Sequence, residues 1–175
     1  MHKINQKLKN VFLSIGSNCG DREKHILGLL KNINNNAGKI ISISHLYETK
    51  PWGFNSEVPF LNIVVEIETL RSPEELLLEL QSIEKSYKKS QQTTEFQSRI
   101  GDVDILLYND LILTTEQLVV PHPLFHLRSF CVIPLADIAG DFIHPVLGKK
   151  INEFALNFCK DQSITLYLHK QNLQF

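Results

Sequence analysis

The sequence lacks the marks of several large classes of protein. Its three cysteines, Cys19, Cys131 and Cys159, are widely spaced and never form a Cys-x-x-Cys pair. This argues against a disulfide framework or a zinc knuckle, and it is typical of the reducing cytoplasm, where we expect the protein to act. The apolar stretch Val11–Ile15 behind the basic start is too short for the core of a signal peptide. No apolar run approaches the ~20 residues of a membrane span, so we expect no membrane partner.

An excess of charge of one sign is also missing. Eighteen Lys and Arg residues stand against nineteen Asp and Glu residues, which leaves a net charge of -1. Non-specific binding to nucleic acid needs a basic surplus, so nucleic acid is not an expected partner. The 43% apolar and 21% charged content is that of a globular protein. A chain of 175 residues predicts a single domain over residues 1–175, which we expect to be a monomer with one binding cleft.

Hydrophobic periodicity predicts the order of the elements. Strands are expected at 11–15, 41–47, 60–67, 102–108 and 164–168. Helical spacing behind Asp21 predicts a first helix that ends at Asn34–Gly38. Ser72-Pro73-Glu74-Glu75 begins a second helix, with Ser as the N-cap, Pro at the first position and Glu three residues after the cap. A third helix is expected from about Arg128 to Ile138.

The segment Lys88–Ser98 is polar and has no periodicity. We therefore expect a mobile loop there, of a length that is more often functional than idle. The remaining elements follow the order βαββαβ, with the second and third strands as an antiparallel pair. This order predicts an α+β protein with a ferredoxin-like core and an extra helix and strand on the C-terminal side.

Two carboxylates, Asp102 and Asp104, lie two residues apart in the fourth predicted strand. The period of two puts both on one face, and Leu106 and Tyr108 are expected to continue that face. An isolated Asp-x-Asp pair more often marks a solvated strand face. Here the apolar neighbours indicate that the face is not simply exposed. Because Mg²⁺ prefers one or two carboxylates completed by water and phosphates, the pair predicts a site for a nucleotide and its metal.

Basic residues near this strand are candidates for phosphate binding. Arg99 lies three residues before Asp102, where its guanidinium could grip a phosphate or form a rim salt bridge with Asp102. His122 lies between two prolines and Arg128 follows six residues later; either could contact a phosphate, and a loop histidine without a task is the equal alternative. His122 and His126 have helical spacing, but no third ligand is near in the sequence, which argues against a zinc site.

Asn62 is a polar residue in an otherwise apolar strand, on the same face as Phe60 and Val64. It could read the polar edge of a heterocycle, although spacing alone favours an amide bonded to the neighbouring backbone. The glycine turn Gly16–Gly20 lacks the Gly-Lys-Ser/Thr ending of a P-loop and is one glycine short of a dinucleotide fingerprint. The turn by itself is therefore weak evidence for a nucleotide.

Six short segments follow one another in a characteristic order. They are Phe12–Asn18, Tyr47–Gly53, Phe60–Asn62, Arg99–Tyr108, Val120–Pro123 and Arg128–Phe130. Together they resemble the 6-hydroxymethyl-7,8-dihydropterin pyrophosphokinases, folate-pathway enzymes that transfer a pyrophosphoryl group from ATP to a pterin alcohol. The resemblance covers most of the chain.

The resemblance implies a role for particular residues. Asp102 and Asp104 match the carboxylates that bind two Mg²⁺ ions, and with Arg99 and Lys89 they form the implied catalytic group. The positions that match the ATP site are Gln81, Glu84, His122 and Arg128. The positions that match the pterin pocket are Thr49, Pro51, Trp52, Phe60, Asn62 and Phe130, with Phe60 and Phe130 as the aromatic pair around the ring.

The sequence departs from the family pattern mainly in Lys88–Ser98. The family usually has Gly-Arg-x-Arg after the second helix, whereas Lys89 and Gln91 occupy the arginine positions here. Before the aspartate pair only Arg99 remains as an arginine. We predict a cytoplasmic pyrophosphokinase that uses ATP and Mg²⁺. The alternative is a non-catalytic pterin- or nucleotide-binding module on the same fold.

Overall fold

The computed structural model describes residues 7–50, 58–90 and 101–175, with the backbone alone for 88–90. Elements labelled η are single 3-10 turns. The elements are β1 (Lys9–Ser17), α1 (Arg22–Asn36), β2 (Lys39–Ile43), β3 (Leu46–Thr49), β4 (Phe60–Thr69), α2 (Pro73–Ser90), β5 (Asp102–Tyr108), β6 (Leu113–Thr114), β7 (Val119–Val120), η1 (Phe125–Leu127), α3 (Ser129–Ala139), α4 (Ile151–Ala155), η2 (Leu156–Phe158), β8 (Ile164–Leu168) and η3 (Lys170–Asn172).

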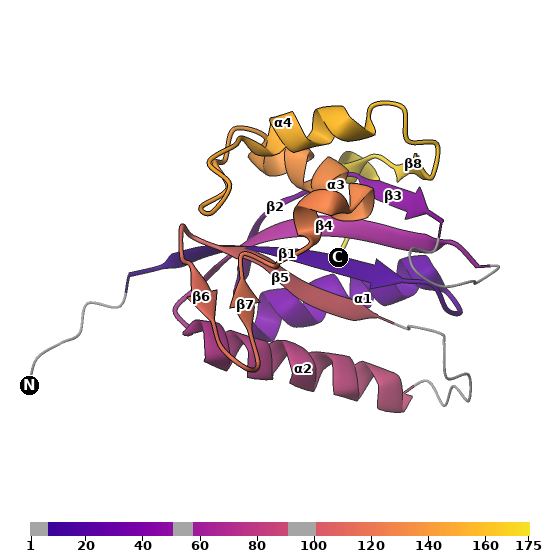
Figure 1. Cartoon of the computed structure of the whole chain (residues 1–175). Helices are drawn as coiled ribbons and strands as arrows, with labels where there is room; N and C mark the ends of the chain where they lie inside the picture. Colours follow the sequence, from indigo (N-terminus) through magenta and orange to yellow (C-terminus); the bar gives the residue numbers. More distant parts are fainter. Residues whose placement is uncertain (1–6, 51–57, 91–100) are drawn as a thin grey trace, which may run out of the picture.

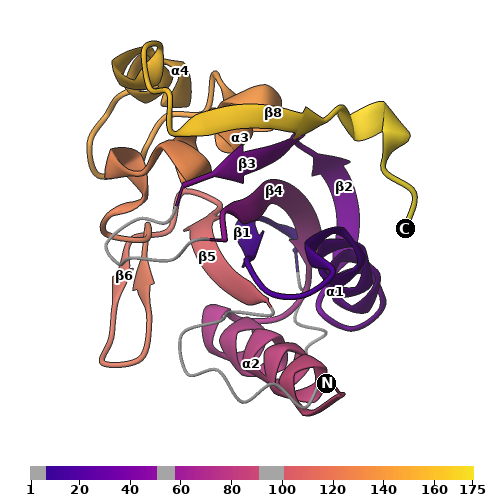
Figure 2. The same ribbon diagram turned by 90° about the vertical axis from the view of Figure 1, so that its right-hand side faces the viewer.

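A six-stranded antiparallel sheet forms the centre of the molecule (Figures 1 and 2). The strand order is β5-β1-β4-β3-β8, and β2 pairs with β4 along the same edge as β3. Strands β5, β1 and β4 with the β2/β3 pair occupy the places of a split βαβ sheet. The predicted ferredoxin-like core is confirmed, and β8 is the extra strand at its edge.

Alternation along β1 divides the apolar core between the two faces of the sheet. Val11, Leu13 and Ile15 are completely buried on the face that α1 and α2 cover, whereas Phe12 packs with residues of α3 and α4. Figure 1 shows these two pairs of helices on opposite sides of the sheet. Asp104 at the start of β5 is exposed, so α3 and α4 leave that end of their face open.

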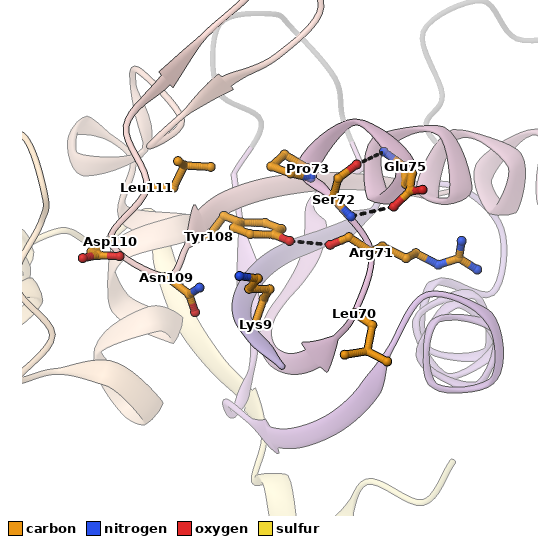
Figure 3. Close-up of a pocket in the computed structure, with 10 residues that line it drawn as sticks. All are labelled: Lys9, Leu70, Arg71, Ser72, Pro73, Glu75, Tyr108, Asn109, Asp110 and Leu111. Atoms are coloured by element: carbon orange, nitrogen blue, oxygen red, sulfur yellow. Dashed lines mark hydrogen bonds between the residues drawn. The ribbon is translucent and has the colours of Figure 1, made fainter. Parts of the chain in front are cut away.

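Strand β5 has the predicted bounds but contains a bulge. Leu13 of β1 is paired with Ile105 and Phe12 is paired with Leu107, so Leu106 is an extra residue. Beyond the bulge the side chains change faces, and Tyr108 lies in the core under α1 and α2. Its hydroxyl donates to the carbonyl of Arg71 beside the start of α2 (Figure 3). The prediction that Tyr108 shares the face of the two aspartates is wrong for this reason.

The second predicted strand is two strands, β2 and β3, which both pair with β4. Ser44 separates them: its backbone N–H donates to the Val64 carbonyl at 2.9 Å, and its hydroxyl accepts from the Val64 N–H at 3.0 Å. The side chain thus takes the place of a ladder carbonyl, which interrupts the strand. The predicted antiparallel pairing with the next strand is confirmed on both sides of the break.

The capping sequence of α2 behaves as predicted. The Ser72 N–H donates to Glu75 Oε2 at 2.7 Å, and the Glu75 N–H donates to the Ser72 hydroxyl at 3.2 Å. At its other end the helix continues to Ser90, so the expected loop does not begin at Lys88. The rest of that expectation, residues 91–98, lies outside the described residues.

Candidate functional site

Asp102 and Asp104 share one face of the sheet, as predicted, and it is the face opposite α1 and α2. The alternate residues Val103 and Ile105 are buried in the core under those helices, which forces the aspartates to the other side. Asp102 is half-buried and Asp104 is exposed. Both carboxylates are therefore held on a fixed strand with access from solvent.

A row of residues runs from Asp102 across three strands. Asp102 is paired with Gly16 of β1, and Gly16 is paired with Asn62 of β4. At neighbouring-strand spacing, Asp102 and Asn62 are roughly 10 Å apart at the backbone. A Cβ at Gly16 would lie 2.9 Å from Asn62 Oδ1, so this position has no room for a larger residue unless the amide moves. The glycine keeps the surface between carboxylate and amide open.

Asn62 has a side-chain partner rather than the backbone partner that spacing favoured. Its Nδ2 donates to Thr49 Oγ1 at 2.7 Å, and both residues are buried. Thr49 is in turn the register partner of Phe60, which is half-buried. Three residues of the expected pterin pocket thus meet at the adjoining ends of β3 and β4. The expected pocket residues Pro51 and Trp52 lie outside the described residues.

The turn that carries His122 and Arg128 is anchored on the bulge of β5. The His122 N–H donates to the Leu106 carbonyl at 2.9 Å, and the Arg128 N–H donates to the Phe125 carbonyl at 3.0 Å. Burial lowers the pKa of His122 from its ordinary 6.5, Arg128 lowers it further, and Asp104 opposes them. Asp104, His122 and Arg128 are therefore close enough to interact, although they are far apart in the sequence.

One contact determines the tautomer of the neutral His122 ring. Its Nδ1 accepts a hydrogen bond from the Leu124 N–H at 3.3 Å. The lowered pKa favours the neutral ring, and that contact leaves the proton of the neutral ring on Nε2. His122 can therefore donate to an acceptor such as a phosphate oxygen.

Phe130, expected in the pterin pocket, contacts Arg128, expected in the ATP site. Its ring lies under the Arg128 guanidinium, whose Cζ is 5.8 Å from the ring centroid. The next residue, Cys131, is buried, and its Sγ is 3.8 Å from the hydroxyl of Ser14. Burial raises the pKa of the Cys131 thiol to about 12, so the thiol stays protonated and is no nucleophile. No local sequence pattern predicts this contact, because Ser14 and Cys131 are far apart in the chain.

The second helix is attached to the start of β5. Glu84 Oε1 accepts from the Val103 N–H at 2.7 Å, so α2 is attached to β5 at the residue that follows Asp102. Gln81 is exposed one turn earlier on α2. Lys89 is also on α2, with its side chain undescribed, and Arg99 and Gln91 lie outside the described residues.

The donor set at Asp102 and Asp104 is one that suits Mg²⁺. Mg²⁺ is usually bound by one or two carboxylates and completes its shell with water and substrate phosphates. Within residues 7–50, 58–90 and 101–175, no three His, Cys, Asp or Glu side chains group as metal ligands. The described helices include none that is long and apolar enough to cross a bilayer.

Solved structures identify the class of fold. A Plasmodium falciparum HPPK-DHPS triple mutant with STZ-DHP matches with a TM-score of 0.71 and 18% identity, over 89% of this chain and 44% of that one. The wild-type enzyme with pteroate matches with a TM-score of 0.71 and 17% identity, over 87% of this chain. This chain is thus an α+β protein with the ferredoxin-like fold of those HPPK domains, and it spans less than half of those longer chains.

Sequence comparison identifies the family. The family model of 7,8-dihydro-6-hydroxymethylpterin-pyrophosphokinase (HPPK) matches residues 12–140. The 2-amino-4-hydroxy-6-hydroxymethyldihydropteridine pyrophosphokinase of Aquifex aeolicus is 39% identical over 147 residues, 84% of this chain and 91% of that protein. The enzyme of that name from Bacillus subtilis is 38% identical over 163 residues, 92% of this chain and 97% of that protein. The chain belongs to the HPPK family.

Membership of the family fixes the reaction class. The chain is a diphosphokinase that transfers pyrophosphate from ATP to the hydroxymethyl group of a dihydropterin in folate synthesis. This supports the predicted enzyme over the non-catalytic binding module. A folic acid synthesis protein of Pneumocystis carinii is 40% identical over 144 residues, and the chain spans 19% of its length.

Proposed function

We propose that Asp102 and Asp104 bind Mg²⁺, two ions by the family resemblance, and that the pterin lies over the adjoining ends of β3 and β4. The row Asp102, Gly16 and Asn62 carries this proposal, because it sets the carboxylate and the amide on one face of the sheet with only a glycine between them. The phosphates and the pterin can then lie side by side over β1. That arrangement is what in-line transfer between two substrates needs.

The reaction needs no covalent bond to the protein. The pterin hydroxymethyl oxygen bonds to the β-phosphorus of ATP while the bond from that phosphorus to the oxygen bridging to the α-phosphate breaks. AMP leaves, and the hydroxyl proton passes to solvent. Bound Mg²⁺ supplies positive charge that offsets the charge of the phosphates.

The chain's own residues orient the two substrates. His122 donates from Nε2 to a phosphate oxygen, and the Arg128 guanidinium offers a planar fork to the same chain of phosphates. Gln81 and Glu84 line the nucleotide end. Lys89 and Arg99 are proposed to supply further charge there.

At the pterin end, polar and aromatic residues divide the work. Thr49 and Asn62 present hydrogen-bonding groups to the polar edge of the ring, since their side chains are already fixed against each other. Phe60 and Phe130 are proposed to enclose the faces of the ring, with Pro51 and Trp52 completing the pocket. The oriented amide recognises a heterocycle at little cost in side-chain entropy.

Single-turnover AMP formation tests the metal assignment. We expect Asp102→Asn and Asp104→Asn to lower the rate by about 100-fold or more at saturating Mg²⁺, since charge neutralisation of phosphate is worth several kcal/mol. Asp110→Asn is the matched control, because Asp110 is exposed just beyond the other end of β5. Half of the wild-type rate in either variant, with the melting temperature unchanged, would show that the metal binds elsewhere.

A further inference from the structure

Arg22, the first residue of α1, joins the end of β3 to the residue that precedes β4. Its Nη1 donates to Glu48 Oε1 at 2.7 Å and to the Pro59 carbonyl at 2.8 Å. Glu48 is in β3, and Pro59 immediately precedes β4. The Arg22 side chain is 21% exposed and that of Glu48 is 34% exposed. The pair is thus partly shielded from water, where a charge-assisted hydrogen bond is stronger than on an open surface.

The start of α1 holds Arg22 in a defined place. The helix is capped by Asp21, whose Oδ1 accepts from the Lys24 N–H at 3.1 Å. Gly20 precedes the cap with a φ of 57°, a left-handed conformation that glycine adopts without strain. The guanidinium therefore extends from a fixed turn behind β1 toward the ends of β3 and β4.

The two acceptors of Arg22 each adjoin a residue of the proposed pterin site. Glu48 precedes Thr49, Pro59 precedes Phe60, and Thr49 and Phe60 are register partners. Asn62 depends on the same alignment, because its amide donates to the Thr49 hydroxyl. One guanidinium thus fixes the separation of the two strand ends that present these side chains.

We infer that Arg22 is a positioning residue for the pterin site. This inference rests on the proposed function, which assigns Thr49, Phe60 and Asn62 to the pterin. The nucleotide end is fixed by other contacts, among them that of Glu84 with Val103. Loss of Arg22 should therefore weaken the binding of the pterin and leave the binding of the nucleotide nearly unchanged.

Equilibrium binding to the full chain tests this inference. The probes are 6-hydroxymethyl-7,8-dihydropterin, followed by its fluorescence, and a non-hydrolysable ATP analogue with Mg²⁺, followed by calorimetry. We expect Arg22→Met to weaken pterin binding by about tenfold, the effect of losing hydrogen bonds to a charged group. Arg22→Lys should be intermediate, because an ammonium is a point charge without the planar fork. Glu48→Gln should be milder still, since its amide oxygen can still accept.

Arg71→Met is the matched control. Arg71 pairs with Glu79 at 3.0 Å at the far end of the sheet, so this variant removes one arginine from a comparable ion pair. We expect wild-type binding of both probes. Unchanged pterin binding in Arg22→Met, or equal loss of both probes, would overturn the inference. If Arg22→Met does not fold, the two milder variants decide the question. We then expect Arg22→Lys to bind the pterin more weakly than Glu48→Gln does, with no such difference for the ATP analogue.

Phe60→Ala separates this inference from the assignment of the pocket. If Phe60→Ala weakens pterin binding and the Arg22 variants do not, only the positioning role is wrong. If Phe60→Ala also binds the pterin like wild type, the pocket has been placed wrongly and the role of Arg22 is wrong with it. Weakened binding in both supports both.

Discussion

Phe130 is the residue at which the two proposed substrate sites meet. Its ring is one of the proposed faces of the pterin pocket, and it also supports the Arg128 guanidinium, a proposed phosphate contact. Phe60 at the other side of the proposed pocket lies at the start of β4, next to Thr49. The two aromatic residues should therefore differ in which substrates they affect.

Substitution to alanine should reveal this difference. Both Phe60→Ala and Phe130→Ala should weaken pterin binding, because an aromatic pair contributes about 0.5–1.5 kcal/mol beyond its buried area. Phe130→Ala should also raise KM for ATP, since Arg128 loses the ring beneath it, whereas Phe60→Ala should not. Measurement of KM for ATP and KM for the pterin in each variant tests this difference. An equal rise in KM for ATP in both variants would contradict the proposal that Phe130 serves both substrates.

The sequence could locate the charged residues of the site better than the amide contacts. Asp102 and Asp104 are placed by strand alternation, which is a local property. The partner of Asn62 is not local: it depends on the register of β3 against β4, and a slip by one residue would turn Thr49 away. The sequence around Arg22 indicates only that it lies in a first helical turn. Its two acceptors are distant in the sequence, so no local pattern predicts them.

At the scale of elements, α2 is longer than the sequence pattern predicts. The polar composition after Tyr87 suggested a loop, but α2 continues to Ser90. Polar residues are ordinary on a solvated helix, so composition alone cannot locate its end. Lys89, the proposed remaining cation near the ATP, is thus borne by a helix that Glu84 attaches to β5.

Lys89 can be tested against a neighbour one turn earlier. Lys89→Ala should slow single-turnover AMP formation with little change in ATP binding, because a positive charge matters most where negative charge develops. Lys89→Arg should match or exceed wild type, since a guanidinium also orients a phosphate. Lys85→Ala, an exposed lysine of the same helix, is the control. A wild-type rate for Lys89→Ala together with a slower Lys89→Arg would exclude Lys89 from the site.

For the whole molecule, a buried histidine makes stability depend on pH. The His144 ring is stacked on Phe125 with centroids 5.2 Å apart, and its Nδ1 accepts from the N–H groups of Val146 and Leu147. Burial, and to a lesser degree His126, lowers the pKa of His144 below 6.5. The folded protein therefore takes up the proton less readily than the unfolded chain does.

The sign of the pH dependence follows from this difference. His144 is neutral in both states above its ordinary pKa of 6.5. Below that pH the unfolded chain binds the proton first, so stability falls with falling pH. We expect the free energy of unfolding to decrease from pH 7 to pH 5, and His144→Gln to flatten that slope although it lowers stability at pH 7. Urea unfolding at several pH values measures both, with His169→Gln as the exposed control. An unchanged slope in His144→Gln would assign the dependence to other groups.

The order of elements along the chain was the most predictable property of the molecule. It follows from periodicity within each segment, and the βαββαβ order admits few antiparallel arrangements. The two faces of β5 were predictable only as far as Ile105, because strict alternation holds up to that residue. The bulge that follows depends on the pairing of β5 with β1, which no local pattern encodes.

The bulge in β5 reverses the alternation of its side chains between the two faces of the sheet. Before Leu106 the even-numbered residues face the candidate site. After it the odd-numbered Leu107 lies on that side, and Tyr108 faces α1 and α2. The beginning of β5 therefore presents the two aspartates of the candidate site, and its end packs Tyr108 into the core. Deletion of the single residue Leu106 would leave regular alternation with the same partners on β1, so Ile105 and Tyr108 would still face α1 and α2 while both aspartates and Leu107 kept the other side.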